Sequence, residues 1–194
     1  LASDFGTIAE LVRAHALAAP AQPALRDPLH ALNYRELDTL MDRVAAALQR
    51  DGLKEGDAIA ICAASSAHYA AVFLGALRAG VAVAPLAPGS APASHARMID
   101  DAGARLLFLD AAAADTLGAL PSCAAARVAL DGTAAGTPFA DWLAPAGTLP
   151  RAARVDPASP FNIIYSSGTT GEPKGIVQGH GMRWAHQRRG CEYG

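Results

Sequence analysis

A short segment near the end of the 194-residue chain gathers the side chains best suited to bind a polyphosphate. Residues 165–175 read Tyr-Ser-Ser-Gly-Thr-Thr-Gly-Glu-Pro-Lys-Gly. Glycines allow tight turns and leave backbone amides uncovered, and successive uncovered amides hold an anion. The hydroxyl groups add donors, and Lys174 adds a compact positive charge. The segment therefore predicts a phosphate-binding loop, whose candidate ligand-binding residues are Ser166, Ser167, Gly168, Thr169, Thr170, Gly171 and Lys174.

The flanking residues place this loop between two strands. Residues 161–165 are an apolar run that predicts a buried strand, and residues 176–178 are β-branched enough to predict a second one. A Walker A loop needs Gly-Lys followed by Ser or Thr and then a helix, whereas Pro173 precedes Lys174 here and Gly175 follows it. A hairpin loop without a ligand is the alternative, but it leaves the lysine and both flanking strands as coincidence.

Three segments carry a resemblance to a known family. Residues 165–175 resemble the phosphate-binding loop of the adenylate-forming superfamily, which includes acyl-CoA synthetases, adenylation domains of nonribosomal peptide synthetases and luciferases. Residues 32–37, Leu-Asn-Tyr-Arg-Glu-Leu, are similar to the Thr-Tyr-x-Glu-Leu element of those enzymes. Residues 77–86 are similar to their Leu-Lys-Ala-Gly-x-x-x-x-Pro-Leu segment. The loop is the most specific of the three, and together they span most of the chain in the family's order.

The resemblance implies ATP-dependent activation of a carboxylic acid through an acyl-adenylate, with a fatty or aromatic acid–CoA ligase as the expected activity. ATP, Mg²⁺ and CoA are the implied cofactors and co-substrates, and Lys174 is the implied catalytic residue. An adenylation domain that loads a carrier protein is the alternative within the same chemistry. A non-catalytic nucleotide-binding module and a hydrolytic nucleotidase are alternatives from other classes.

The resemblance also bears on the extent of the chain. The family's adenine, ribose and C-terminal lysine motifs do not follow residue 175 in this sequence. Residues 1–194 are therefore expected to be the N-terminal part of the large AMP-binding domain, without the rest of that domain or the mobile C-terminal domain. We expect this part alone to be inactive, to lack the main protein ligand of Mg²⁺, and to self-associate through its uncovered surfaces.

The remaining sequence predicts an α/β fold of alternating helices and mostly parallel strands, because strands separated by helices connect through crossovers. The expected helices are 7–18, 34–50, 67–79, 92–102, 111–120, a short piece at 139–143 and a last one beginning near residue 180. The expected strands are 57–62, 81–85, 105–109, 127–130, 161–165 and 176–178, with a small hairpin at 24–26 and 31–33. Residues 85–92 and 132–160 are otherwise expected to be loops, because they are rich in proline, glycine or alanine.

Composition narrows the function classes. The net charge of −2 gives no reason to expect a nucleic-acid partner, and no apolar run approaches the ~20 residues that cross a bilayer. Three widely spaced cysteines without a CxxC pair fit reduced thiols in a cytoplasmic protein. Cys62 is expected to be a buried small hydrophobe, and the Asp100–Asp101 pair a surface feature, so no metal site is predicted.

Two further features leave alternatives open. His180 lies after the second loop strand, either near the acyl or nucleotide pocket or as a helix-start residue that fixes local geometry, and the second reading is favoured. A basic run, Arg183, His186, Arg188 and Arg189, is expected to be a solvated helix face rather than a contact to phosphate or CoA.

Overall fold

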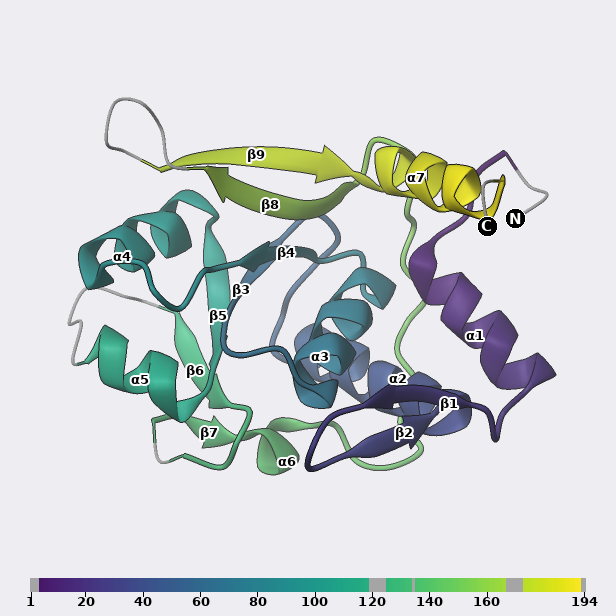
Figure 1. The fold of residues 1–194 in the computed structure, drawn as a ribbon, viewed down its shortest axis with the longest axis horizontal. Coiled ribbons are helices and arrows are strands. Elements are labelled where there is room, and N and C mark those ends of the chain that lie inside the picture. The colour runs from purple at the N-terminus through teal and green to yellow at the C-terminus, as the bar shows by residue number, and fades with distance from the viewer. Residues whose placement is uncertain (1–3, 119–124, 134, 167–172, 193–194) are drawn as a thin grey trace.

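The computed structural model describes residues 4–118, 125–133, 135–166 and 173–192. Within them a seven-stranded sheet has the order β7-β6-β5-β3-β4-β8-β9 (Figure 1). Its strands are β3 Ala58–Cys62, β4 Ala82–Pro85, β5 Ala104–Leu109, β6 Ala126–Ala129, β7 Thr137–Pro138, β8 Pro160–Ser166 and β9 Lys174–Gly179. Every neighbouring pair is parallel except β8 and β9. The predicted α/β fold with a mostly parallel sheet is confirmed.

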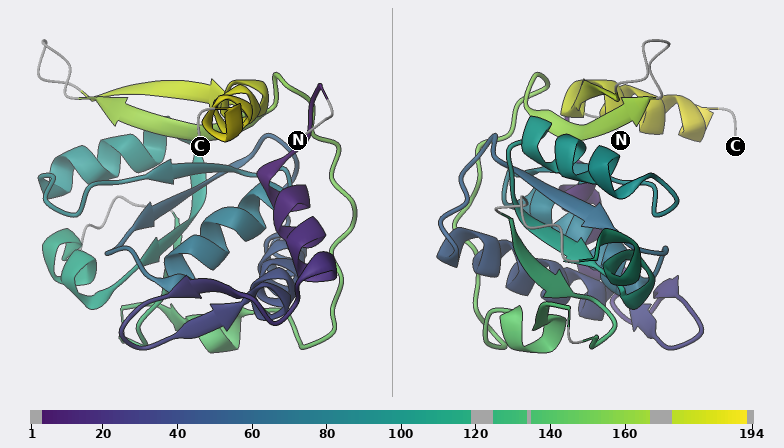
Figure 2. Two further views of the ribbon diagram at one scale, coloured as in Figure 1. Left: turned by 45° about the vertical axis from the view of Figure 1, so that its right-hand side comes forward. Right: turned by 90° about the vertical axis from the view of Figure 1, so that its left-hand side faces the viewer.

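Helices cover both faces of this sheet (Figures 1 and 2). The helices are α1 Ile8–Ala18, α2 Tyr34–Arg50, α3 Ala67–Arg78, α4 Pro92–Asp101, α5 Ala111–Leu117, α6 Phe139–Trp142 and α7 His180–Glu192. Ile59 and Ile61 pack in one buried cluster with α2 and α3, whereas Ala60 and Cys62 pack in a second cluster with α4 and α5. Successive side chains of a strand point to opposite faces, so a fully buried strand such as β3 supplies both cores.

Local capping explains where the first helices begin. Thr7 accepts a hydrogen bond from the backbone of Glu10, whose carboxylate accepts from the Thr7 N–H in return. Asn33 and Glu36 form the same reciprocal pair at α2. These capping boxes satisfy backbone donors that a helix start leaves without partners. The predicted hairpin before α2 is also present, as β1 Pro23–Arg26 and β2 Ala31–Asn33.

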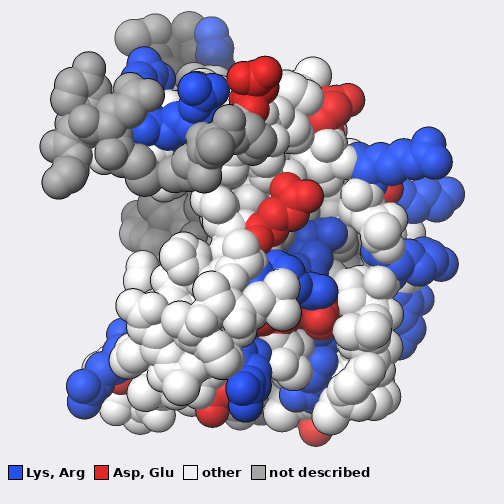
Figure 3. Space-filling view, turned by 90° about the vertical axis from the view of Figure 1, so that its right-hand side faces the viewer, with Lys and Arg blue, Asp and Glu red and all other residues white. Residues whose placement is uncertain are grey.

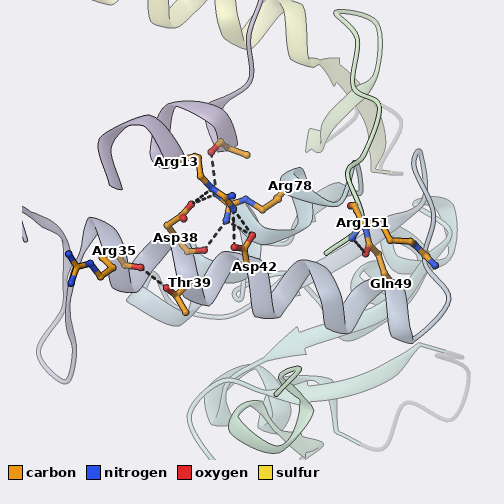
Figure 4. Close-up of polar contacts among 9 residues, drawn as sticks. Arg13, Arg35, Asp38, Thr39, Asp42, Gln49, Arg78 and Arg151 are labelled. Carbon is orange, nitrogen blue, oxygen red and sulfur yellow. Dashed lines mark hydrogen bonds and ion pairs between the residues drawn. The ribbon is translucent and has the colours of Figure 1, made fainter. Parts of the chain in front are cut away.

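A charged network joins the three helices on one side of the sheet (Figure 4). Arg13 of α1 donates to Asp42 of α2 at 2.7 Å, and Arg78 of α3 donates to Asp38 of α2 at 2.6 Å. Arg78 also donates to Asp42, and its side chain is only 10% exposed. A buried charge is stable only when it is paired and hydrogen-bonded, so the network sets how the helices meet. A hollow of about 480 Å³ opens beside it, between α1 and residues 149–155 (Figure 3).

The long connection from β6 to β8 differs in part from the expected loop. It contains β7, which pairs with β6 through Val128–Thr137 and Ala129–Pro138. A strand of two residues carries no alternating pattern, so its neighbour rather than its sequence creates it. The connection then returns along α2, where Gln49 exchanges two hydrogen bonds with the backbone of Arg151 (Figure 4). The expected short helix at 139–143 is present as α6.

The close approach of α2 and α3 yields a testable prediction. A Cβ added at Gly75 would lie 2.6 Å from Cβ of Val44, so we expect Gly75→Ala to force the two helices apart. Overpacking of this kind lowers the free energy of unfolding by about 1–3 kcal/mol, which urea unfolding measures. Gly89→Ala is the matched control, because nothing lies within 4 Å of its added Cβ. Equal stability of the two variants would contradict this account of the packing.

Candidate functional site

The strands on either side of the predicted phosphate loop form an antiparallel hairpin. Strands β8 and β9 pair in a register that sets Ser166 opposite Lys174 and Tyr165 opposite Gly175. Ser166 and Lys174 are both exposed at the turn end of the hairpin. The two strands that the sequence predicts on either side of the loop are therefore present. Five predicted binding residues lie outside the described residues: Ser167, Gly168, Thr169, Thr170 and Gly171.

A tyrosine joins the turn end of this hairpin to α4. The hydroxyl of Tyr165 lies 2.7 Å from Oδ2 of Asp101 and 2.9 Å from the carbonyl oxygen of Met98. Burial, followed by the hydrogen bond to the Asp101 carboxylate, raises the pKa of Tyr165, so the phenol stays protonated and donates. Asp101 is exposed, as the sequence analysis expected, but its link to the loop strand was not foreseen. Residues 64 positions apart give no sequence signal of such a contact.

The register leaves little space for a side chain at the residue after Lys174. A Cβ added at Gly175 would lie 3.0 Å from Oδ2 of Asp101 and 3.1 Å from Cε1 of Tyr165. The tyrosine ring thus packs directly over the glycine backbone across the hairpin, and the aspartate lies against both. Gly175 serves this close contact as well as the turn that the sequence predicted.

His180 lies at the other end of the hairpin. Gly179, the residue before it, pairs with Pro160 at the start of β8, and the seven residues of β8 span roughly 20 Å. The His180 side chain is buried, with its ring 5.1 Å from that of Phe161 in an edge-on contact. The backbone N–H of His180 donates to the carbonyl oxygen of Ser159 at 3.0 Å. These contacts support the reading of His180 as a helix-start residue that fixes local geometry.

The basic run on α7 is partly different from the expectation. His186, Arg188 and Arg189 are exposed, as expected for a solvated face. Arg183 is not part of that face, because its guanidinium carbon lies 5.6 Å above the Phe161 ring and its Nη2 donates to Oε1 of Gln178. An arginine stem and guanidinium pack readily on an aromatic ring, which a count of charges in the sequence does not reveal.

The start of α7 is held by the N-terminal segment. The Trp184 ring packs on Phe5 with ring centroids 6.5 Å apart, and a Cβ added at Gly6 would lie 2.8 Å from the same tryptophan ring. On β9, Ile176 is 53% exposed and Val177 60% exposed. Apolar side chains on an outer strand are a surface that another chain can cover. The self-association predicted from the sequence stays a prediction.

Cys62 is the buried small hydrophobe that the sequence analysis expected. Its side chain is fully buried in β3, and burial, with the nearby carboxylate of Asp110, raises the pKa of its thiol to about 11. Such a thiol is protonated at neutral pH and is a poor nucleophile. Among the residues that the structure describes, no group of three His, Cys, Asp or Glu could hold a metal ion. None of the described helices is long and apolar enough to cross a membrane.

Comparison with known families identifies the fold that carries this hairpin. A family model described as AMP-binding enzyme matches residues 12–192, nearly the whole chain. The chain belongs to the AMP-binding enzyme family. The solved structure of VinN with 3-methylaspartate superposes with a TM-score of 0.81 and is 30% identical, covering 94% of this chain and 50% of that one. The anthranilate CoA ligase AuaEII shares the fold, with a TM-score of 0.83 at 21% identity, over 92% of this chain and 36% of that one.

Curated relatives include ligases with different acceptors. The fatty acid–[acyl-carrier-protein] ligase ScoC of Streptomyces coeruleorubidus is 31% identical over 175 residues, which are 90% of this chain and 33% of that protein. The 3-hydroxybenzoate–CoA ligase of Aromatoleum sp. strain CIB is 32% identical over 188 residues, 89% of this chain and 34% of that protein. The chain thus spans about a third of the length of these two relatives.

Burial of His180 predicts a pH dependence of stability. Its Nε2 atom is buried with no hydrogen-bond partner among the described residues, and burial lowers its pKa below the usual 6.5, although Asp156 opposes the shift. The unfolded chain therefore binds a proton more readily than the folded one. We expect His180 to contribute stability that is complete above about pH 6.5 and is lost as the pH falls toward the lower folded-state pKa.

Urea unfolding between pH 7.5 and pH 5 measures this contribution. The stability of His180→Gln should fall less steeply with decreasing pH than that of the unmodified chain. His186→Gln, at an exposed position of the same helix, should keep the original pH dependence. Parallel curves for the unmodified chain and His180→Gln would rule out a titrating role for His180.

Proposed function

We propose that the protein of which residues 1–194 form the N-terminal part of the AMP-binding domain activates a carboxylic acid with ATP. The products of this step are an acyl-adenylate and pyrophosphate. The observation that supports the proposal most directly is the register that sets Ser166 opposite Lys174 at the turn of the β8–β9 hairpin, inside the family match. The hydroxyls and glycines of residues 166–171 complete the proposed phosphate site.

In the proposed reaction the loop stabilises negative charge on the phosphate oxygens and orients the phosphates. A carboxylate oxygen attacks the α-phosphorus of ATP, the bond from that phosphorus to the bridging oxygen breaks, and pyrophosphate leaves with the electron pair. Negative charge builds up on the phosphate oxygens during this step, and donors already aimed at them lower the barrier. In this proposal Lys174 holds the β- and γ-phosphates as a point charge, and Ser166 donates from the opposite strand.

The proposed reaction uses Mg²⁺, but no described residue is assigned as its ligand. The metal supplies charge neutralisation between phosphates when it is bound, and oxygen ligands are the ones that it prefers. The described carboxylates do not gather into a suitable set, and Asp110 is already used to cap α5 and to accept from the N–H of Ala64. We therefore assign none of the described residues to Mg²⁺ and propose that its main ligand lies outside them.

The proposal also names a class of carboxylic acid and an acceptor for the acyl group. We favour a fatty or aromatic acid and transfer of the acyl group to CoA, in line with the 3-hydroxybenzoate–CoA ligase among the relatives. Loading of a carrier protein is the second candidate, and the similarity to ScoC supports it. A cytoplasmic location is part of the same proposal, since the free thiol of Cys62 fits a reducing compartment.

Exchange of pyrophosphate into ATP tests the role of Lys174. In the full-length protein, with a fatty acid, 3-hydroxybenzoate or L-aspartate as trial acid, we expect Lys174→Ala to slow exchange about 100-fold or more, because one contact to the developing charge is lost. The Kd of the acid should change little. Lys54→Ala is the control, because Lys54 is the other lysine of residues 1–194 and lies exposed before β3. Exchange by Lys174→Ala within twofold of the unmodified protein would refute the assignment.

The isolated chain provides a separate prediction. Residues 1–194 alone should not support pyrophosphate exchange with any of the three acids, because the adenine, ribose and acyl contacts are expected from other residues. The matched sample is the full-length protein at the same concentration. Turnover by the 194-residue chain itself would show that the proposed division of the active site is wrong.

A further inference from the structure

Helix α4 forms hydrogen bonds to two segments, the loop that follows β4 and the end of β8. Near its beginning, Nε2 of His95 lies 2.8 Å from the carbonyl oxygen of Ala87, in the loop that follows β4. The His95 side chain is fully buried, so this bond is protected from water. At the end of the helix, the hydroxyl of Tyr165 lies within hydrogen-bond distance of the Asp101 carboxylate and of the carbonyl oxygen of Met98. Helix α4 therefore fixes the position of the loop after β4 relative to the turn end of the β8–β9 hairpin.

The hairpin needs such a support because the sheet holds it over a short length. The register of β8 with β4 consists of one residue pair, Val83–Asn162, whereas β8 pairs with β9 from Pro160 to Ser166. The turn end of the hairpin lies above α4 in two views of the molecule (Figures 1 and 2). Packing on α4 is thus the contact that orients this end, and Tyr165 supplies its hydrogen bond.

The contact lies next to both described residues of the phosphate site. Tyr165 directly precedes Ser166, and Gly175 directly follows Lys174. Both of these neighbours lie near Asp101: the hydroxyl of Tyr165 donates to its carboxylate, and a Cβ added at Gly175 would lie 3.0 Å from its Oδ2 atom. One carboxylate on α4 is therefore hydrogen-bonded to β8 and lies close to β9, one residue away from the candidate ligand-binding pair.

We propose that Tyr165 and Asp101 are positioning residues, which hold Ser166 and Lys174 in the orientation that binds the phosphates of ATP. This inference rests on the proposed function. The hydroxyl of Tyr165 fixes the hairpin to the C-terminal end of α4, where backbone carbonyls and the carboxylate favour a hydrogen-bond donor. Loss of that bond leaves the ring on Gly175 but lets the turn end move relative to α4.

Steady-state pyrophosphate exchange by the full-length protein provides the first test. Tyr165→Phe should raise the KM for ATP about tenfold or more, the effect expected when a hydrogen bond to a charged group is lost, with an unchanged KM for the acid. Asp101→Ala should raise the KM for ATP by a smaller factor, because the carbonyl oxygen of Met98 still accepts from the phenol. The double variant should be no worse than Tyr165→Phe alone, because that variant already removes the bonds of the phenol to both Asp101 and Met98. Asp101→Asn should restore a KM near the original, because its amide oxygen still accepts from the phenol.

A structural role alone predicts a different pattern. Tyr34→Phe removes a hydroxyl from a tyrosine whose ring stacks on His15, in the helical layer that contains α1 and α2, and should leave the KM for ATP unchanged. If Tyr165→Phe lowers only the free energy of unfolding and not the affinity for ATP, or if the effects of the two single variants add, the proposal is overturned.

Amide hydrogen exchange separates this inference from the proposed function. In the same full-length protein without ligands, Tyr165→Phe should speed exchange at Ile176, near the turn end, about fivefold or more, and leave His180 at the other end unchanged. This measurement does not depend on catalysis. An unmodified protein that shows no pyrophosphate exchange would refute the proposed function, whereas unchanged amide exchange at Ile176 would refute the positioning role.

Discussion

Pairing of β8 with two different neighbours is the interaction on which the candidate site depends. On one side β8 joins the parallel sheet at β4, and on the other it pairs antiparallel with β9 over nearly its whole length. The parallel contact brings the strand to the sheet, and the antiparallel contact returns the chain at once through a turn. Ser166 and Lys174 therefore lie at a hairpin end rather than at a helix start, and this arrangement differs from that of a Walker A motif.

The packing of the central strands and their covering helices fixes the position of β8 in the sheet. Central strands such as β3 and β5 are buried on both faces, and each face has its own apolar cluster under its own helices. Parallel strands need such cover because their connections cross the faces as helices. On the side of α2 and α3 the cover is reinforced by the Arg–Asp network, which excludes other arrangements because a misplaced helix would leave a buried charge unpaired.

The two ends of the β8–β9 hairpin are stabilised by different physics. At the far end, His180 and Arg183 pack on the Phe161 ring, and burial keeps the histidine neutral. At the turn end, the support is polar and partly exposed, a phenol bonded to the end of a helix. For the phosphate-binding role proposed above, an adjustable polar support suits the hairpin better than an apolar core, whose packing resists small movements.

Much of this protein was readable from the sequence alone. Hydrophobic periodicity and capping residues predict α1, α2 and α3 to within a residue or so, because these signals are local. The hydroxyls, glycines and lysine of residues 165–175 predict the candidate ligand, and the apolar residues 161–165 and β-branched residues 176–178 predict the strand on each side. Side-chain chemistry and strand preference belong to the residues themselves, so these predictions need no distant partner. Only the tertiary structure decided the two-residue strand β7, the packing of Arg183 on Phe161 and the bond from Tyr165 to Asp101. Each of these depends on a partner far away along the chain, and a single sequence does not encode which distant surfaces meet.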